Sequence, residues 1–148
     1  KMMVVTSMES LSQESNTLDL DPNVIDKWGL SVPRITYNVH PNEWKLGDFF
    51  RNRAKDLLEA AGATQVLAGR NSVPRGDAHL MGTCRMGNDP QTSVLNKFNQ
   101  SHDVKNLFVV DGSCFVTSGK SNPTLTIQAL AYRASEYLVD QMKQGTIG

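Results

Sequence analysis

The fold of this chain is decided by residues 106–113, which read Asn-Leu-Phe-Val-Val-Asp-Gly-Ser. Four consecutive apolar residues, 107–110, predict a fully buried strand of the kind found in the middle of a parallel sheet. Asp111, Gly112 and Ser113 then end the strand, because these residue types favour turns. A carboxylate at the carboxyl end of such a strand lies where open α/β sheets bind ligands, and an ordinary turn is the alternative explanation.

The clearest helix of the chain follows this strand after a polar loop. Asn122 is expected to cap the helix, and Pro123 to occupy its first position. Apolar residues then recur at helical spacing until Gly145, where the helix is expected to end. They are residues 125, 127, 130, 131, 134, 138 and 142. Free N–H groups at the start of such a helix favour anionic ligands, and ordinary capping explains the same residues.

The N-terminal part gives weaker signals for strands. Residues 2–5 are expected to form a short strand, followed by a mobile polar loop as far as Pro22. Residues 23–29 predict one helical turn that ends at Gly29. The alternation of polar with β-branched or aromatic residues over 34–40 predicts a half-buried strand.

A second helix is predicted from Asn42, which can cap it, to Gly62, which ends it. Its apolar residues recur at three- and four-residue spacing, so one face is expected to be buried. Residues 63–104 differ, because Gly, Asn, Asp, Ser and Pro dominate and apolar runs are short. An irregular stretch of this length inside a domain is usually functional.

Composition places the chain among globular proteins, since 39% of its 148 residues are apolar and 20% are charged. The 15 Lys and Arg balance the 15 Asp and Glu, so net charge does not indicate nucleic acid or an anionic membrane as a partner. No apolar run approaches the roughly 20 residues that span a bilayer, and no signal peptide is visible. We therefore expect a soluble protein, cytoplasmic or periplasmic.

The loop from Ala78 to Gly87 holds His79 between short polar and glycine-containing stretches. An imidazole can act as a general base near neutral pH, and nearby glycines allow a ligand to approach closely. A histidine with only structural hydrogen bonds is the alternative. Zinc is disfavoured, because Cys84 alone accompanies His79 and a zinc site needs more ligands. Cys84 and Cys114 are expected to be unbridged thiols, buried or half-buried.

Three motifs occur in a fixed order along the chain. His-x2-Gly-Thr-x2-Met-Gly begins at His79, the strand motif occupies 106–113, and Asn-Pro-Thr-Leu-Thr-Ile-Gln-Ala-Leu-Ala begins at Asn122. In this order and spacing, residues 76–143 resemble the end of a glucose-methanol-choline (GMC) oxidoreductase. Residues 18–62 resemble, more loosely, the substrate domain of the sugar-oxidising branch. No Gly-x-Gly-x-x-Gly motif occurs, so the chain resembles the C-terminal part of such an enzyme.

The resemblance implies an α+β fold in two parts. Residues 1–75 would be a portion of the substrate domain, and residues 76–148 would be flavin-facing. The strand and the C-terminal helix of the second part would complete an FAD-binding, Rossmann-like sheet. The missing N-terminal region would lie in the same chain or in a partner subunit, and this chain alone is expected neither to retain FAD nor to be active.

The resemblance also implies a reaction, the oxidation of a CH–OH group of a sugar or polyol. His79 would accept the hydroxyl proton while a hydride passes to flavin N5. Asn122 would orient the hydroxyl, since an amide cannot act as the base. The competing interpretation is a catalytically inert binding or interaction module descended from such an enzyme, and an upstream Gly-x-Gly-x-x-Gly would favour the enzyme.

The cofactor-binding residues that the resemblance implies are Asp111, Gly112, Pro123, Thr124 and Leu125. Asp111 and Gly112 match positions where the chain passes the FAD pyrophosphate and ribityl groups. Thr124 and Leu125 match residues beside the pyrimidine edge of the isoalloxazine, where a helix N-terminus would favour anionic reduced flavin.

Overall fold

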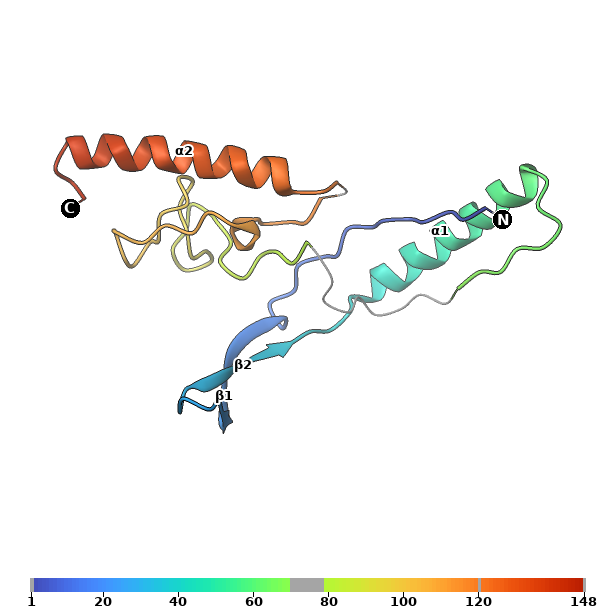
Figure 1. The fold of residues 1–148 in the computed structure, drawn as a ribbon, viewed down its shortest axis with the longest axis horizontal. Coiled ribbons are helices and arrows are strands. Elements are labelled where there is room, and N and C mark those ends of the chain that lie inside the picture. The colour runs from blue at the N-terminus through green and yellow to red at the C-terminus, as the bar shows by residue number, and fades with distance from the viewer. Residues whose placement is uncertain (1, 70–78, 120, 148) are drawn as a thin grey trace.

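The computed structural model describes residues 2–69, 79–119 and 121–147. Within these ranges the regular elements are β1 (Thr17–Ile25), β2 (Ser31–Thr36), α1 (Pro41–Ala60), the 3₁₀ turn η1 (Gly112–Cys114) and α2 (Thr124–Lys143). The hairpin and α1 lie apart from α2, which runs along the irregular C-terminal segment (Figure 1). The chain is therefore a small mixed fold of two helices and a two-stranded sheet over its described residues.

β1 and β2 form an antiparallel hairpin, in which Thr17 pairs with Thr36 and a bulge follows Leu20. The strand expected over 34–40 is confirmed only in its first part, because β2 ends at Thr36. The expected half-burial is wrong, since Ile35 is 72% exposed. Its physical reason is that no other helix or strand of the described residues packs closely on the hairpin.

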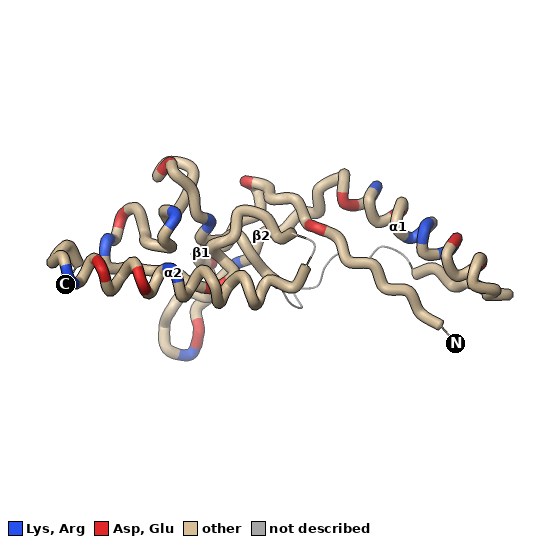
Figure 2. Tube along the Cα trace, turned by 90° about the horizontal axis from the view of Figure 1, so that it is seen from above, with Lys and Arg blue, Asp and Glu red and all other residues tan. Residues whose placement is uncertain are grey.

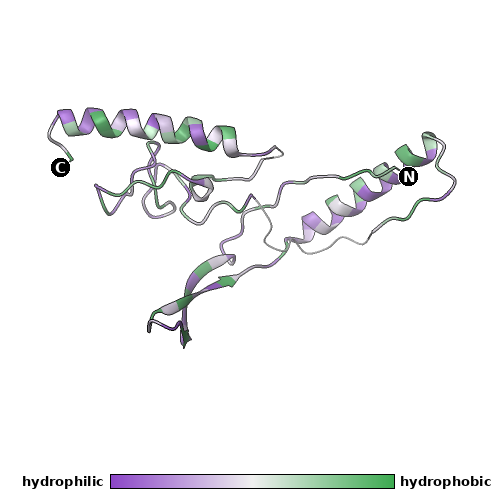
Figure 3. Cartoon of the chain, in the orientation of Figure 1, coloured by the Kyte–Doolittle hydropathy of each residue, from purple (hydrophilic) through white to green (hydrophobic). Residues whose placement is uncertain are grey.

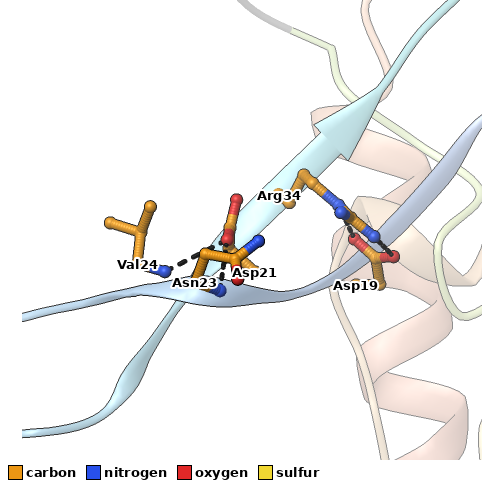
Figure 4. Close-up of polar contacts among 5 residues, drawn as sticks. All are labelled: Asp19, Asp21, Asn23, Val24 and Arg34. Carbon is orange, nitrogen blue, oxygen red and sulfur yellow. Dashed lines mark hydrogen bonds and ion pairs between the residues drawn. The ribbon is translucent and has the colours of Figure 1, made fainter.

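Side chains of β1 explain why residues 17–22 form a strand rather than the expected mobile loop. The Asp21 carboxylate accepts hydrogen bonds from the N–H groups of Asn23, at 2.8 Å, and Val24, at 3.1 Å, and so shapes the bulge (Figure 4). Arg34 donates its Nε–H to Asp19 at 2.9 Å across the two strands, and this ion pair lowers the pKa of the exposed Asp19 carboxyl. Cross-strand pairs of opposite charge stabilise such hairpins modestly.

The helical turn expected over 23–29 is also wrong, since this segment ends β1 and forms the hairpin turn. The Asp26 carboxylate accepts hydrogen bonds from the N–H groups of Trp28, at 2.8 Å, and Leu30, at 2.9 Å. Gly29 has a φ of +85°, which suits the turn as well as it would suit a helix end. Gly29 therefore does not end a helix, as predicted, but lies in the turn between β1 and β2.

Helix α1 matches the predicted helix closely. The cap differs, because the His40 Nδ1 atom, and not Asn42, accepts a backbone hydrogen bond, from the Asn42 N–H at 3.1 Å. Gly62, with φ +90°, ends the helix as expected and donates its N–H to the Glu59 carbonyl at 2.9 Å.

The apolar face of α1 is buried only in part, since Leu46 and Leu58 are half-buried. Phe49 and Leu57 are 56% and 60% exposed, and Gly47 is the buried residue of the helix. Charged residues of both signs follow one another along α1 (Figure 2). Several form ion pairs three or four residues apart, namely Arg51–Asp48, Arg53–Asp56 and Lys55–Glu59. These ion pairs stabilise α1 locally, in addition to the hydrogen bonds that Ser10 and Leu11 of the N-terminal segment donate to Glu43.

The N-terminal segment forms no strand at residues 2–5, contrary to expectation. It connects the two parts of the fold instead. The Ser10 N–H donates to the Ser118 hydroxyl at 3.3 Å, and the Ser10 hydroxyl donates to the Glu43 carboxylate of α1 at 3.0 Å.

The C-terminal part has a small core between α2 and the irregular segment. Leu95, Cys114 and Ala134 are buried, and the rings of Phe98 and Tyr137 stack with centroids 4.1 Å apart. Polar and apolar residues follow one another along α2, as an amphipathic helix requires (Figure 3).

The buried strand predicted over 107–110 is wrong for the described residues. Phe108 forms a single antiparallel bridge with Gln100, and Leu107 and Val110 are 48% and 39% exposed. An apolar run forms a buried strand only when neighbouring strands cover it, and the described ranges contain none beside it.

The start of α2 also differs from expectation, while its end does not. Pro123 is the N-cap, and no side chain caps the helix, so Asn122 does not have the predicted role. Gly145, with φ +68°, donates its N–H to the Met142 carbonyl at 3.1 Å and ends the helix as predicted. No helix of the described residues is long and apolar enough to cross a membrane.

Candidate functional site

Backbone hydrogen bonds hold the loop after His79 against η1. The N–H of Cys84 donates to the Ser113 carbonyl, and the N–H of Met86 donates to the Cys114 carbonyl, both at 3.0 Å. Two of the three predicted motifs are therefore in direct contact, although the bonded residues are 28 and 29 positions apart in the sequence.

Asp111 caps η1 through its own side chain. One carboxylate oxygen accepts hydrogen bonds from the Ser113 hydroxyl and from the Ser113 N–H, the latter at 2.8 Å. These bonds, the hydroxyl first, lower the pKa of the Asp111 carboxyl, because they stabilise its charged form. Asp111 is exposed, so it presents a negative charge at neutral pH. The turn and the ligand interpretations of this residue are thus compatible.

Gly112 is the point at which all three motifs meet. A Cβ atom at this position would lie 3.2 Å from the Leu80 carbonyl oxygen, 3.6 Å from the Met81 side chain and 3.6 Å from Ile127 of α2. The resemblance implies a cofactor beside Gly112, and the Leu80 carbonyl lies close to one side of this residue. The glycine therefore allows the His79 loop and α2 to pack together.

Substituting Gly112 tests this packing. We expect Gly112→Ala to lower the free energy of unfolding by about 1–3 kcal/mol, because the nearest atom is a backbone carbonyl that must shift. Chemical denaturation of the full-length protein measures the effect. Gly69→Ala is the matched control, since a Cβ there would have no neighbour within 4 Å among the described residues. Equal stability of the two variants would contradict the packing role.

His79 has an unusual backbone conformation, with φ +64°. Its side chain is exposed, and no hydrogen bond between described residues involves its imidazole. Non-glycine residues in the left-handed region are uncommon and cluster at functional sites. The exposed ring is therefore accessible to a ligand.

The N-terminus of α2 lies beside a shallow depression of about 270 Å³. Asn122, Pro123 and Thr126 line it together with residues 115, 117–119 and 121. Because no side chain caps the helix, the first N–H groups of α2 are left for another acceptor. Leu125, in this first turn, is 78% exposed.

The predicted site residues thus fall into two groups. His79 and Gly112 belong to the packed loops, and Asn122 and Pro123 line the depression. No hydrogen bond between described residues joins the His79 side chain to Asn122. Over the same residues, no three metal-binding side chains lie together.

A buried polar group near the site was not predicted. Asn99, with φ +62°, is completely buried, and its side-chain oxygen has no hydrogen-bond partner among the described residues. It neighbours Cys114, whose burial raises the pKa of the thiol, an effect that the Asn99 side chain partly opposes. Cys114 is buried and Cys84 half-buried, and both are free thiols, as expected. The sequence offered one signal for Asn99, the tolerance of asparagine for positive φ.

Comparison with known proteins places these motifs in a wider context. Residues 12–131 match the model of a protein family described as GMC oxidoreductase. The 2-methyl-1,2-propanediol dehydrogenase of Mycolicibacterium austroafricanum is 44% identical over 137 residues, which are 93% of this chain and 25% of that protein. The fructose dehydrogenase large subunit of Gluconobacter japonicus is 33% identical over 142 residues, or 96% of this chain and 26% of that subunit.

A shorter match, 44% identical over 61 residues, is to the cholesterol oxidase of Acinetobacter baumannii and covers 41% of this chain and 11% of that enzyme. The chain therefore spans about a quarter of the length of the two relatives that it matches along almost its whole sequence.

Proposed function

This chain belongs to the GMC oxidoreductase family, and on that premise we propose that it is the C-terminal part of an FAD-dependent enzyme that oxidises a CH–OH group of a sugar or polyol. One observation carries the proposal: almost the entire chain matches both a diol dehydrogenase and a fructose dehydrogenase subunit. The family supports oxidation of CH–OH donors in general, and these two names favour small polyhydroxylated substrates.

The residues around η1 and the start of α2 fit a flavin cofactor. The uncapped N–H groups of α2 favour negative charge, so Pro123, Thr124 and Leu125 would hold the pyrimidine edge. The exposed Asp111 carboxylate would accept hydrogen bonds from ribityl hydroxyls, and Gly112 would keep this segment close to the His79 loop. FAD, when bound, supplies the acceptor for the hydride that leaves the substrate carbon.

This chain would contribute two functions to the reaction: it would accept the proton of the substrate hydroxyl, and it would orient that hydroxyl. An unprotonated ring nitrogen of His79 would take the proton of the substrate hydroxyl, for which its exposed imidazole is suited. Asn122 would hold the hydroxyl by hydrogen bonding from the edge of the depression.

The missing N-terminal region would cover the surfaces that this chain leaves bare. The exposed apolar side chains of Leu107 and Val110 would pack in a Rossmann-like sheet that the region completes. The division into a substrate-domain portion, 1–75, and a flavin-facing portion, 76–148, is part of the same proposal.

The experiment that tests the function compares the full-length protein with this chain alone. We expect the full-length protein to be yellow, with about one FAD per chain, and its flavin to lose colour anaerobically with a polyol or sugar. The isolated chain is the control and should be colourless, because no Gly-x-Gly-x-x-Gly is present to hold the adenosine diphosphate.

Two outcomes would contradict the proposal. A full-length protein without flavin, or with flavin that no polyol or sugar reduces, would indicate the inert binding module instead. A yellow isolated chain with stoichiometric flavin would show that the residues of this chain suffice to bind FAD.

A further inference from the structure

We propose that Asn99 is a positioning residue, which fixes the cofactor-facing segment at Asp111 and Gly112 by binding both polar groups of the Val109 backbone. The inference rests on the proposed function, since it concerns how this chain presents those two residues to FAD.

Two hydrogen bonds join Asn99 to Val109. The Val109 N–H donates to the Asn99 carbonyl, and the Asn99 side-chain amide donates to the Val109 carbonyl, both at 3.0 Å. Asn99 therefore binds both the N–H and the carbonyl of Val109, which lies two positions before Asp111. The bridge between Gln100 and Phe108 continues the pairing toward the N-terminus of that segment.

Asparagine suits this position for a specific combination of reasons. Its φ of +62° lies in the left-handed region, which glycine and asparagine tolerate best. Glycine would keep that conformation but would lose the amide donor, and aspartate would keep the shape but place a carboxylate against the Val109 carbonyl. The unpartnered, buried Oδ1 atom is a further cost at this residue. An unsatisfied polar group at a completely buried residue points to a function beyond stability.

The turn that carries Asn99 is fixed to α2. Phe98 stacks on Tyr137 of α2, and the Tyr137 hydroxyl lies 3.4 Å from the Gln100 side-chain oxygen, to which it donates. Asn99 thereby ties the segment at Asp111 to the helix whose first turn holds Thr124. Asp111 and Gly112 are thus held at a fixed position relative to the first turn of α2, although no hydrogen bond between described residues joins the two directly.

The decisive variant is Asn99→Gly in the full-length enzyme, because glycine keeps the backbone conformation and removes the amide donor. We expect the dissociation constant for FAD, measured by reconstituting the apoprotein, to rise about five- to tenfold, as the loss of one hydrogen bond predicts. Flavin reduction at saturating FAD and substrate should stay within about twofold of wild type. Asn88→Gly is the control, an exposed asparagine in the same irregular segment, and should bind FAD as wild type does.

A second measurement does not depend on the folding of the variant. Hydrogen exchange of residues 106–113 in the wild-type apoprotein should already show protection, because Asn99 holds Val109 before FAD binds. An unprotected segment in the apoprotein, or an unchanged FAD dissociation constant in a folded Asn99→Gly enzyme, would overturn the proposal. A wild-type protein that binds no FAD would instead refute the proposed function itself.

Discussion

Replacing His79 with alanine in the full-length enzyme is expected to slow flavin reduction by saturating substrate about 10²- to 10⁴-fold, the usual contribution of a general base. The reason is chemical. An alcohol becomes a good hydride donor only as its proton is removed, and of the two proposed catalytic residues only His79 can hold that proton reversibly. Anaerobic stopped-flow absorbance, which follows the loss of flavin colour, measures the rate directly.

The backbone of His79 calls for a second variant. With φ +64°, alanine would add strain, whereas asparagine accepts this conformation and cannot act as a base. His79→Asn should therefore lose as much rate as His79→Ala. His102→Ala is the control, because the His102 side chain bonds to the Ser93 hydroxyl at 3.0 Å, outside the proposed site. Flavin reduction near the wild-type rate in His79→Asn would remove the assignment of the base, and with it the main functional claim.

Both long helices could be predicted because their signals are local. Apolar spacing defines α1 and α2, and Gly62 and Gly145 end them through positive φ angles that need no tertiary contact. The caps were less predictable. His40 replaces Asn42 at α1, and α2 begins at Pro123 without any side-chain cap. Several residue types can cap a helix, so the sequence shows roughly where a helix begins but not which residue caps it.

Strands were predicted poorly because they depend on neighbours. The run at 107–110 has the composition of a buried strand, yet it forms one bridge and stays partly exposed, because the described part of the chain places no sheet beside it. The hairpin differs, because local bonds shape it: the Asp21 and Asp26 carboxylates accept hydrogen bonds from backbone N–H groups two residues on. The sequence analysis expected a mobile loop as far as Pro22 and a helical turn over 23–29 instead. A buried strand depends on neighbouring strands that are distant in sequence, and its apolar pattern does not identify them.

In the candidate site, too, local features could be predicted from the sequence and tertiary contacts could not. Residue types with the right chemistry, such as His79 and Asp111, could be found from motifs. The close approach of Leu80 to Gly112 and the burial of Asn99 could not, because both arise from packing between segments distant in sequence. A glycine in a motif indicates that something lies close to it, but only the structure shows that the neighbour is backbone.

Replacing Asn122 with alanine should also slow flavin reduction, by about 10²- to 10³-fold, as expected for the loss of one positioning hydrogen bond in an active site. The range overlaps that of His79→Ala, so the size of the effect alone does not separate the roles.

The pH dependence of the rate separates them. An amide gains and loses no proton in the working range, so Asn122→Ala should keep the shape of the wild-type pH profile at a lower rate, whereas His79→Asn should flatten it. Ser121→Ala is the matched control, since Ser121 lines the same depression and has no proposed role. Because Asn122 does not cap α2, its replacement removes no helix hydrogen bond, and a lower rate would reflect the site rather than unfolding of the helix. A changed pH profile in Asn122→Ala would mean that this residue sets the protonation of the base, and the division between proton transfer and orientation would then have to be abandoned.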